Sequence, residues 1–198
     1  MGLNEKSGIH IEGHIKVYDP NTHEVYVNKR NAIHYENFSI SLATAMINNG
    51  TGFINEMVFG NEGTIVDPTG IITYKTPNVY GPNASLYNQT YNKVVSTSIN
   101  NTNPEKNYMQ IRHAAGMTYT DIFITCLLDY SEPSSQPAFD NPTNYNSEYA
   151  FDEIGLKSYD SNLLLTHVIF HPIQKSLNRQ LQFDYTVRIQ ALSGLLGG

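Results

Sequence analysis

Histidines spaced four residues apart are the first features of the sequence that suggest chemistry, because imidazoles bind metal ions. His10 and His14 form one such pair, and His167 and His171 form another. Both pairs lie in segments whose apolar residues alternate as they do in a β-strand. Four residues of a strand span about 13 Å, which is too far for two side chains to share one ion. We therefore expect neither a metal site nor a cofactor.

Asp152 and Glu153 are the clearest candidates for acid–base catalysis. Neighbouring residues of a strand point to opposite faces, so we expect that these carboxylates cannot act on one substrate or share a site with His167 or His171. No Gly-x-Ser-x-Gly motif indicates a nucleophilic serine. The single cysteine, Cys126, lies in an apolar run and is expected to be a small buried side chain. The sequence thus predicts that the protein is not an enzyme.

Fourteen tyrosines and no tryptophan make aromatic contacts the main candidates for binding. Tyrosines beside a Pro-rich segment could form a stacking platform for a sugar. Tyrosine is also enriched at protein–protein interfaces, and the absence of Trp favours that interpretation. The residues that we expect at an interface lie in or near two loops: Tyr80, Tyr87, Pro133, Pro137, Tyr145 and Tyr149.

The composition indicates a polar surface with few charges. Charged residues make up 15% of the 198 residues, and roughly one residue in nine is Asn. Such a surface suits flat contacts with neighbouring subunits, or simply belongs to a β-rich protein with many Asn turns. The formal net charge of −6, without a cluster of Lys and Arg, argues against direct binding to nucleic acid. No apolar segment is typical of a signal peptide or a membrane span, so we expect a soluble cytoplasmic protein with no membrane partner.

Alternating apolar residues predict a mainly β fold, an antiparallel β-sandwich. In the clearest run, residues 181–191, the odd-numbered residues are apolar and the even-numbered ones are polar. Phe38, Leu42, Ala45 and Met46 form one apolar stripe, which predicts one short N-terminal α-helix at about 35–48. Further strands are expected at 9–17, 25–27, 54–59, 70–75, 87–98, 108–114, 118–129, 150–157 and 163–170.

The chain is expected to form one domain at 9–192, with a flexible arm at 1–8 and a flexible tail at 193–198. A Pro-rich loop is expected at 131–147, which has almost no aliphatic residue. Loops of this length tend to be functional or interface loops, although a mobile surface excursion is an equal alternative. The arm and the loop carry too little apolar surface to fold alone, so both are candidates for segments that become ordered on assembly.

Three segments, in this order, resemble virion proteins of tailed bacteriophages, of the tail, collar and fibre-attachment kind. The first is Lys29-Arg30-Asn31-Ala32-Ile33 with the helix that follows it. The second is Ile54-Asn55-Glu56-Met57-Val58-Phe59-Gly60-Asn61-Glu62-Gly63-Thr64, similar to an apolar strand that ends in a Gly-x-Gly-Thr turn, although the turn here is one residue longer. The third is Glu153-Ile154-Gly155-Leu156, then the strand at 163–170, then Pro172-Ile173-Gln174-Lys175-Ser176 before the last strand. The resemblance implies a β-sandwich with one helix that assembles as a ring or trimer and has no enzymatic activity.

The expected function is that of a non-enzymatic structural component of a tailed-phage virion, in the neck or collar, the tail or the baseplate. Its partners would be copies of itself, in a homo-oligomer, and neighbouring virion proteins. One alternative is a receptor- or glycan-binding fibre module, which requires exposed coplanar tyrosines around the Pro-rich loop. Another is a capsid decoration protein. A small β-fold enzyme would require a cleft with converging carboxylates.

Overall fold

The computed structural model describes residues 6–95, 107–139, 147–160 and 162–194. One set of strands, sheet A, contains β1 (Lys6–Tyr18), β2 (Val25–Arg30), β8 (Asn107–Arg112), β9 (Tyr119–Leu128) and β12 (Leu181–Gly194). A second set, sheet B, contains β3 (Ala32–Ile33), β4 (Ile54–Gly60), β7 (Gln89–Val94), β10 (Ala150–Ser158) and β11 (Leu164–Gln174). A small hairpin is made of β5 (Thr64–Val66) and β6 (Ile72–Tyr74), and helix α1 spans Tyr35–Met46.

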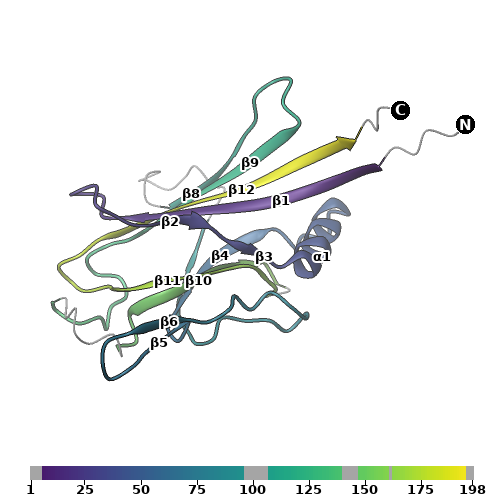
Figure 1. The fold of residues 1–198 in the computed structure, drawn as a ribbon. Coiled ribbons are helices and arrows are strands. Elements are labelled where there is room, and N and C mark those ends of the chain that lie inside the picture. The colour runs from purple at the N-terminus through teal and green to yellow at the C-terminus, as the bar shows by residue number, and fades with distance from the viewer. Residues whose placement is uncertain (1–5, 96–106, 140–146, 161, 195–198) are drawn as a thin grey trace, which may run out of the picture.

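The two sheets pack face to face as an antiparallel β-sandwich, which confirms the predicted fold class (Figure 1). Sheet A has the strand order β2-β1-β12-β9-β8, and sheet B has the order β3-β11-β10-β4-β7. The chain crosses from sheet A to sheet B between β2 and β3. Every strand expected from alternation is present, whereas β3 and β5 are too short for alternation to reveal them.

Alternation along the strands directs one face of each sheet into a shared core. Phe183 and Tyr185 of β12, with Ile15 of β1, are at most 1% exposed. Across the sandwich, the rings of Phe59 and Phe183 meet edge to face with centroids 4.9 Å apart. Cys126 of β9 is fully buried in the same core, as its apolar surroundings predict. The odd-numbered residues of β12 from Leu181 to Val187 are therefore part of the core.

Helix α1 closes part of one end of the sandwich. His34 precedes it, and its Nδ1 accepts a hydrogen bond from the N–H of Asn37 at 3.2 Å, so the histidine caps the first turn. Phe38 is buried against the core, and Asn37 donates to the carbonyl of Leu164 at 2.9 Å. After the helix, Asn48 has a left-handed φ of 53°, which ends the helical path where the sequence predicts.

The structure corrects three predicted boundaries. Strand β1 begins at Lys6 and β12 ends at Gly194, so residues 6–8 of the expected arm and 193–194 of the expected tail belong to the β1–β12 ladder. Residues 1–5 and 195–198 lie outside the described part of the chain. Strand β11 continues through Pro172 to Gln174, where a connection was expected. Pro172 is tolerated because the β10–β11 register shifts there, from Phe151 opposite Ile173 to Glu153 opposite Ile169.

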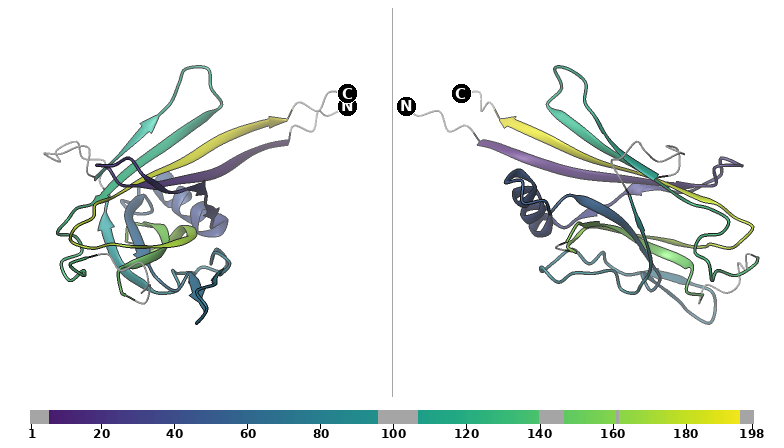
Figure 2. Two further views of the ribbon diagram at one scale, coloured as in Figure 1. Left: turned by 60° about the vertical axis from the view of Figure 1, so that its left-hand side comes forward. Right: turned by 180° about the vertical axis from the view of Figure 1, so that it is seen from behind.

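The paired ends of β1 and β12 form a ribbon that projects beyond α1 (Figure 2). Strand β1 pairs with β12 along its whole length, from Lys6 opposite Gly194 to Tyr18 opposite Gln182. Strand β2 pairs only with the last part of β1, from His14 to Tyr18. Sheet B does not extend under the projecting end, so the inner face of sheet A is uncovered there (Figure 2).

Candidate functional site

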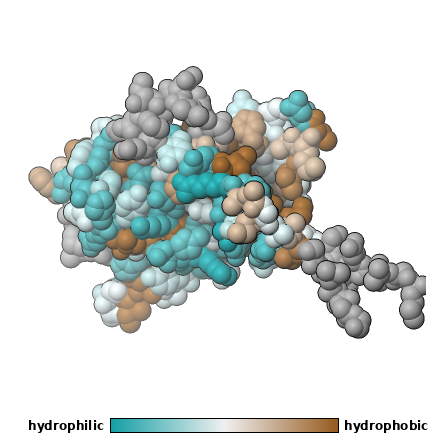
Figure 3. Space-filling model, turned by 90° about the horizontal axis from the view of Figure 1, so that it is seen from above, coloured by the Kyte–Doolittle hydropathy of each residue, from teal (hydrophilic) through white to brown (hydrophobic). Residues whose placement is uncertain are grey.

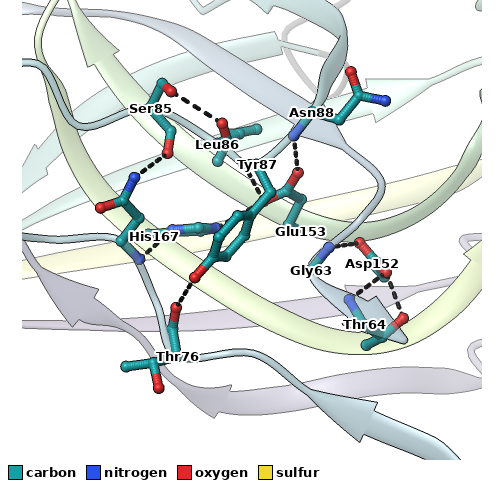
Figure 4. A network of polar contacts seen from close by, with 11 residues as sticks. Gly63, Thr64, Thr76, Ser85, Leu86, Tyr87, Asn88, Asp152, Glu153 and His167 are labelled. Carbon is teal, nitrogen blue, oxygen red and sulfur yellow. Dashed lines mark hydrogen bonds and ion pairs between the residues drawn. The ribbon is translucent and has the colours of Figure 1, made fainter. Parts of the chain in front are cut away.

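Asp152 and Glu153 of β10 are both buried, and each accepts hydrogen bonds from its own set of donors on other parts of the chain (Figure 4). Asp152 lies at the β10–β11 register shift, which breaks the regular alternation of side chains. Its carboxylate accepts hydrogen bonds from the N–H of Gly63 at 2.9 Å and from the N–H of Thr64 at 2.8 Å. The Thr64 hydroxyl donates to it as well. Burial raises the pKa of Asp152, although these hydrogen bonds act in the opposite direction.

Glu153 is 0% exposed and accepts three hydrogen bonds. The backbone N–H of Tyr87 lies 2.9 Å from Oε2, and the N–H of Asn88 lies 2.8 Å from Oε1. The third donor is the imidazole of His167, whose Nε2 is 2.9 Å from Oε2. The expectation that His167 could not share a site with Glu153 is therefore wrong, because they face each other on the neighbouring strands β10 and β11.

The hydrogen bonds of His167 determine its tautomer. Its Nδ1 lies 2.7 Å from the backbone N–H of Asn78 and must accept that proton, so Nδ1 carries none. The hydrogen is then on Nε2, where it is donated to Glu153. Glu153 thus accepts from His167 as it does from the two backbone N–H groups. Both side chains are 0% exposed, so these three hydrogen bonds all come from protein donors.

This carboxylate network clamps two loops onto sheet B. Asp152 binds the turn between β4 and β5, and Glu153 with His167 binds the segment from Asn78 to Asn88 that leads into β7. Neither Glu153 nor His167 has a surface that a substrate can reach. The arrangement therefore positions backbone and does not present an acid–base pair to solvent. The sequence signal for it is two adjacent carboxylates inside an apolar strand, which is typical of buried acceptors with dedicated donors.

The described residues contain neither a cluster of metal ligands nor an exposed thiol. No three His, Cys, Asp or Glu side chains in that part of the chain lie close enough to hold a metal ion. Burial raises the pKa of the Cys126 thiol to about 12, so it stays protonated and unreactive near neutral pH.

The six expected interface residues occupy very different environments. Tyr80 is 83% exposed, and Tyr87 is 40% exposed while its hydroxyl donates to the carbonyl of Thr76. Tyr149 is only 8% exposed, so its ring belongs to the core and leaves little surface for the expected partner contact. Pro133 is buried and Pro137 is half-buried. Tyr145 lies outside the described residues.

The first part of the Pro-rich loop is fastened to the sandwich, which the low apolar content of the loop did not predict. Lys175 is fully buried, and its Nζ donates to the side chain of Gln136 at 2.6 Å. The hydroxyls of Ser135 and Tyr149 are 2.8 Å apart, and the N–H of Leu177 donates to the carbonyl of Pro137 at 2.9 Å. Residues 131–139 are therefore ordered without a partner, while 140–146 lie outside the described residues.

The open end of the sandwich forms an apolar groove with a volume of about 670 Å³. One wall is the inner face of sheet A beyond the reach of sheet B, and the other is α1 with the start of β4. Within the groove, Ile111 is 75% exposed and Phe53 is 47% exposed. The apolar side chains that line it are Phe38, Leu42, Ala45, Phe53, Ile54, Met109, Ile111, Ile122, Leu165 and Ile189.

The apolar surface continues from the groove onto the projecting ribbon. Ile9 lies on the same face of β1 as Ile11, which is opposite Ile189 of the groove, and Ile9 is 62% exposed. Seen from above, hydrophilic side chains cover much of the molecule, and hydrophobic ones gather toward the end from which the termini leave (Figure 3). Exposed apolar side chains gathered at one end of a soluble protein mark a candidate interaction site.

Among the described residues, no helix has both the length and the apolar character that crossing a membrane requires.

Comparison with known proteins adds no functional assignment. The chain matches no protein-family model, and no curated protein or solved structure is significantly similar to it.

Proposed function

We propose that the protein is a non-enzymatic structural component of a tailed-phage virion, which acts by assembling with copies of itself and docking neighbouring virion proteins. The observation that carries the proposal is the open apolar end of the sandwich. Its groove joins the inner face of sheet A to α1 and leaves Ile111 and Phe53 exposed, and Ile9 is exposed on the neighbouring ribbon.

The energetics of this end favour a contact with another protein surface. Full burial of a large apolar side chain contributes about 1.5–3 kcal/mol. Covering Ile9, Phe53 and Ile111, which are 62%, 47% and 75% exposed, would then contribute roughly 3–6 kcal/mol. Association costs about 4–15 kcal/mol in lost translational and rotational freedom. The groove therefore promotes assembly but needs additional contacts to hold copies together.

The segments that resemble phage virion proteins are neighbours in space, which supports reading them as one structural unit. They supply β3, β4, β10 and β11, four adjacent strands of sheet B, together with α1. Within them, the Gly63-Thr64 turn of the second segment is bound by Asp152, immediately before the third segment begins at Glu153. The polar groups of these segments are used to hold the fold, in keeping with a structural role.

Native mass spectrometry of the purified chain over a range of concentrations tests the assembly part of the proposal. We expect an oligomer whose population falls in the variant Ile111→Glu, which places a charge in the groove. Ile71→Glu is the matched control, because Ile71 is 64% exposed and lies in the loop before β6. Circular dichroism melts verify that both variants fold. A chain that remains monomeric at every concentration would overturn self-assembly.

Mass spectrometry of purified particles tests the virion part of the proposal. Phage particles released from cells that carry the gene should contain the chain in a fixed ratio to the other virion proteins. A chain found only in the soluble lysate, at the density of free protein, contradicts the assignment to a virion.

A further inference from the structure

The projecting half of β1 is a sheet edge without a partner strand in the described structure. On one side, the β1–β12 ladder runs without a register shift to Lys6 opposite Gly194. On the other side, β2 leaves the edge after Arg30, which lies opposite His14. The last backbone bond on that side runs from the N–H of Asn31 to the carbonyl of Gly13 at 3.1 Å. Residues 6–12 of β1 thus have one free edge.

The backbone groups that face this edge follow from the Gly13 bond. Along a strand, every second residue directs its N–H and C=O to the same edge, so Ser7, Ile9 and Ile11 share the direction of Gly13. Strand β12 leads to the same assignment. Ala191 lies across from Ile9 and donates its N–H away from β1, to the carbonyl of Thr118 at 2.8 Å. The free edge therefore presents the N–H and C=O groups of Ser7, Ile9 and Ile11.

This edge lacks the devices that normally prevent pairing between chains. Soluble proteins protect exposed edges with Pro, with central charges or with bulges. The segment Ser7-Gly8-Ile9-His10-Ile11 contains no Pro and no Asp, Glu, Lys or Arg, and its ladder with β12 is regular. A groove of about 490 Å³ runs beside it, lined by His10, Ile11, Glu12 and Gly13 on one side and by residues that include Tyr35, Glu36 and Tyr80 on the other.

We propose that the free edge of β1 pairs antiparallel with the same edge of a second copy, so that sheet A continues across a two-fold axis at Ile9. This inference rests on the self-assembly proposed above and names the surface through which two copies meet. The two copies would exchange about six backbone hydrogen bonds, through Ile9 opposite Ile9 and Ser7 opposite Ile11. The exposed Ile9 side chains of both copies would lie on the same face of the joined sheet.

The register follows from the length of the free edge and from its charges. Because β2 occupies the edge from Gly13 onward, centring on Ile9 is the arrangement that pairs all of residues 6–12. In this register residue 6 of each copy, a lysine, lies opposite Glu12 of the other, whose carboxylate also lies 3.9 Å from Arg30 and from Arg188 of its own chain. Opposite charges across an antiparallel pair stabilise it, whereas like charges destabilise it.

A proline scan tests the inference, because only alternate N–H groups take part. Ile9→Pro removes an N–H that faces the free edge and leaves the bonds to β12 intact, whereas Ile9→Ala shortens the same side chain but keeps that N–H. We expect Ile9→Pro to raise the dissociation constant of the dimer by about tenfold or more over Ile9→Ala, measured by analytical ultracentrifugation. In wild type, the amides of Ile9 and Ile11 should gain protection from hydrogen exchange as the concentration rises.

A charge reversal provides a second test that does not depend on proline. Lys6→Glu places like charges opposite each other and should weaken the dimer more than Lys6→Gln, which only removes the charge. If Ile9→Pro assembles as well as Ile9→Ala, or if assembly leaves the Ile9 and Ile11 amides unprotected, the edge pairing is refuted. Loss of assembly in Ile111→Glu would in that case leave the proposed function standing. A chain that is monomeric at all concentrations overturns both.

Discussion

Replacing Glu153 by glutamine tests the physical account of the buried carboxylate network. Glutamine has almost the same shape, but one oxygen becomes an amide nitrogen that can only donate. Both oxygens of Glu153 accept hydrogen bonds, from Asn88 on one side and from Tyr87 and His167 on the other. His167 cannot relieve the conflict by moving its proton, because its Nδ1 already accepts from Asn78. In either orientation of the amide, at least one donor loses its acceptor.

The size of the effect follows from these contacts. The better orientation of the glutamine leaves only the Asn88 N–H without an acceptor, which costs about 1–3 kcal/mol in a buried site. The two remaining hydrogen bonds also lose the strength that a charged acceptor gives them. We therefore expect the free energy of unfolding to fall by about 2–5 kcal/mol. For a chain of this length, that corresponds to a decrease in Tm of roughly 5–20 °C.

The assay combines a global and a local measurement. Thermal melts followed by circular dichroism give the change in Tm, with Glu62→Gln as the control because Glu62 carries the same carboxylate in an exposed turn. Hydrogen exchange in the native state gives the local effect. The Tyr87 and Asn88 amides should lose more protection than amides in the β1–β12 ladder, which the network does not contact.

The result that would refute the reasoning is a Glu153→Gln variant that melts within about 1 °C of wild type and keeps the protection of Tyr87 and Asn88. Such a result would mean that Glu153 is already protonated, or that the loop is held by other contacts. A large decrease in Tm with uniform loss of protection would instead show that the network supports the whole sandwich and not the loop alone.

Two further predictions concern single groups of the described core. Because burial raises the pKa of Asp152 above its ordinary value of 3.8, the folded state binds that proton more tightly than the unfolded chain does. The stability advantage of wild type over Asp152→Asn should therefore decrease as the pH rises above 3.8 through the folded-state pKa. Urea unfolding at a series of pH values measures this advantage. An advantage that grows with pH in this range would contradict the raised pKa. Burial raises the pKa of the Cys126 thiol to about 12, so a thiol reagent at pH 8 should label it only at the rate of unfolding. Rapid labelling of the native protein would contradict this and show that strand β9 is accessible.

The carboxylate network shows where prediction from sequence failed and why. Alternation assigns residues to faces within one strand, and by that rule Asp152 and Glu153 are separated. The rule says nothing of the register shift in β10, which brings Asp152 into contact with a turn that lies 88 residues away from it in sequence. Nor does it say that β11 places His167 beside Glu153. Contacts between strands depend on pairing, which a local pattern does not contain.

The longer strands, the helix, the sandwich class and the burial of Cys126 were predictable from the sequence, because alternation and apolar stripes are local properties that the backbone geometry enforces. Packing between distant elements places Tyr149 in the core, fastens the start of the Pro-rich loop through Lys175 and leaves one end of the sandwich open. The open end exists because β1 and β12 are longer than the strands of sheet B that could cover them. Coverage of a face depends on the relative lengths and positions of paired elements, and those are set when the two sheets pack.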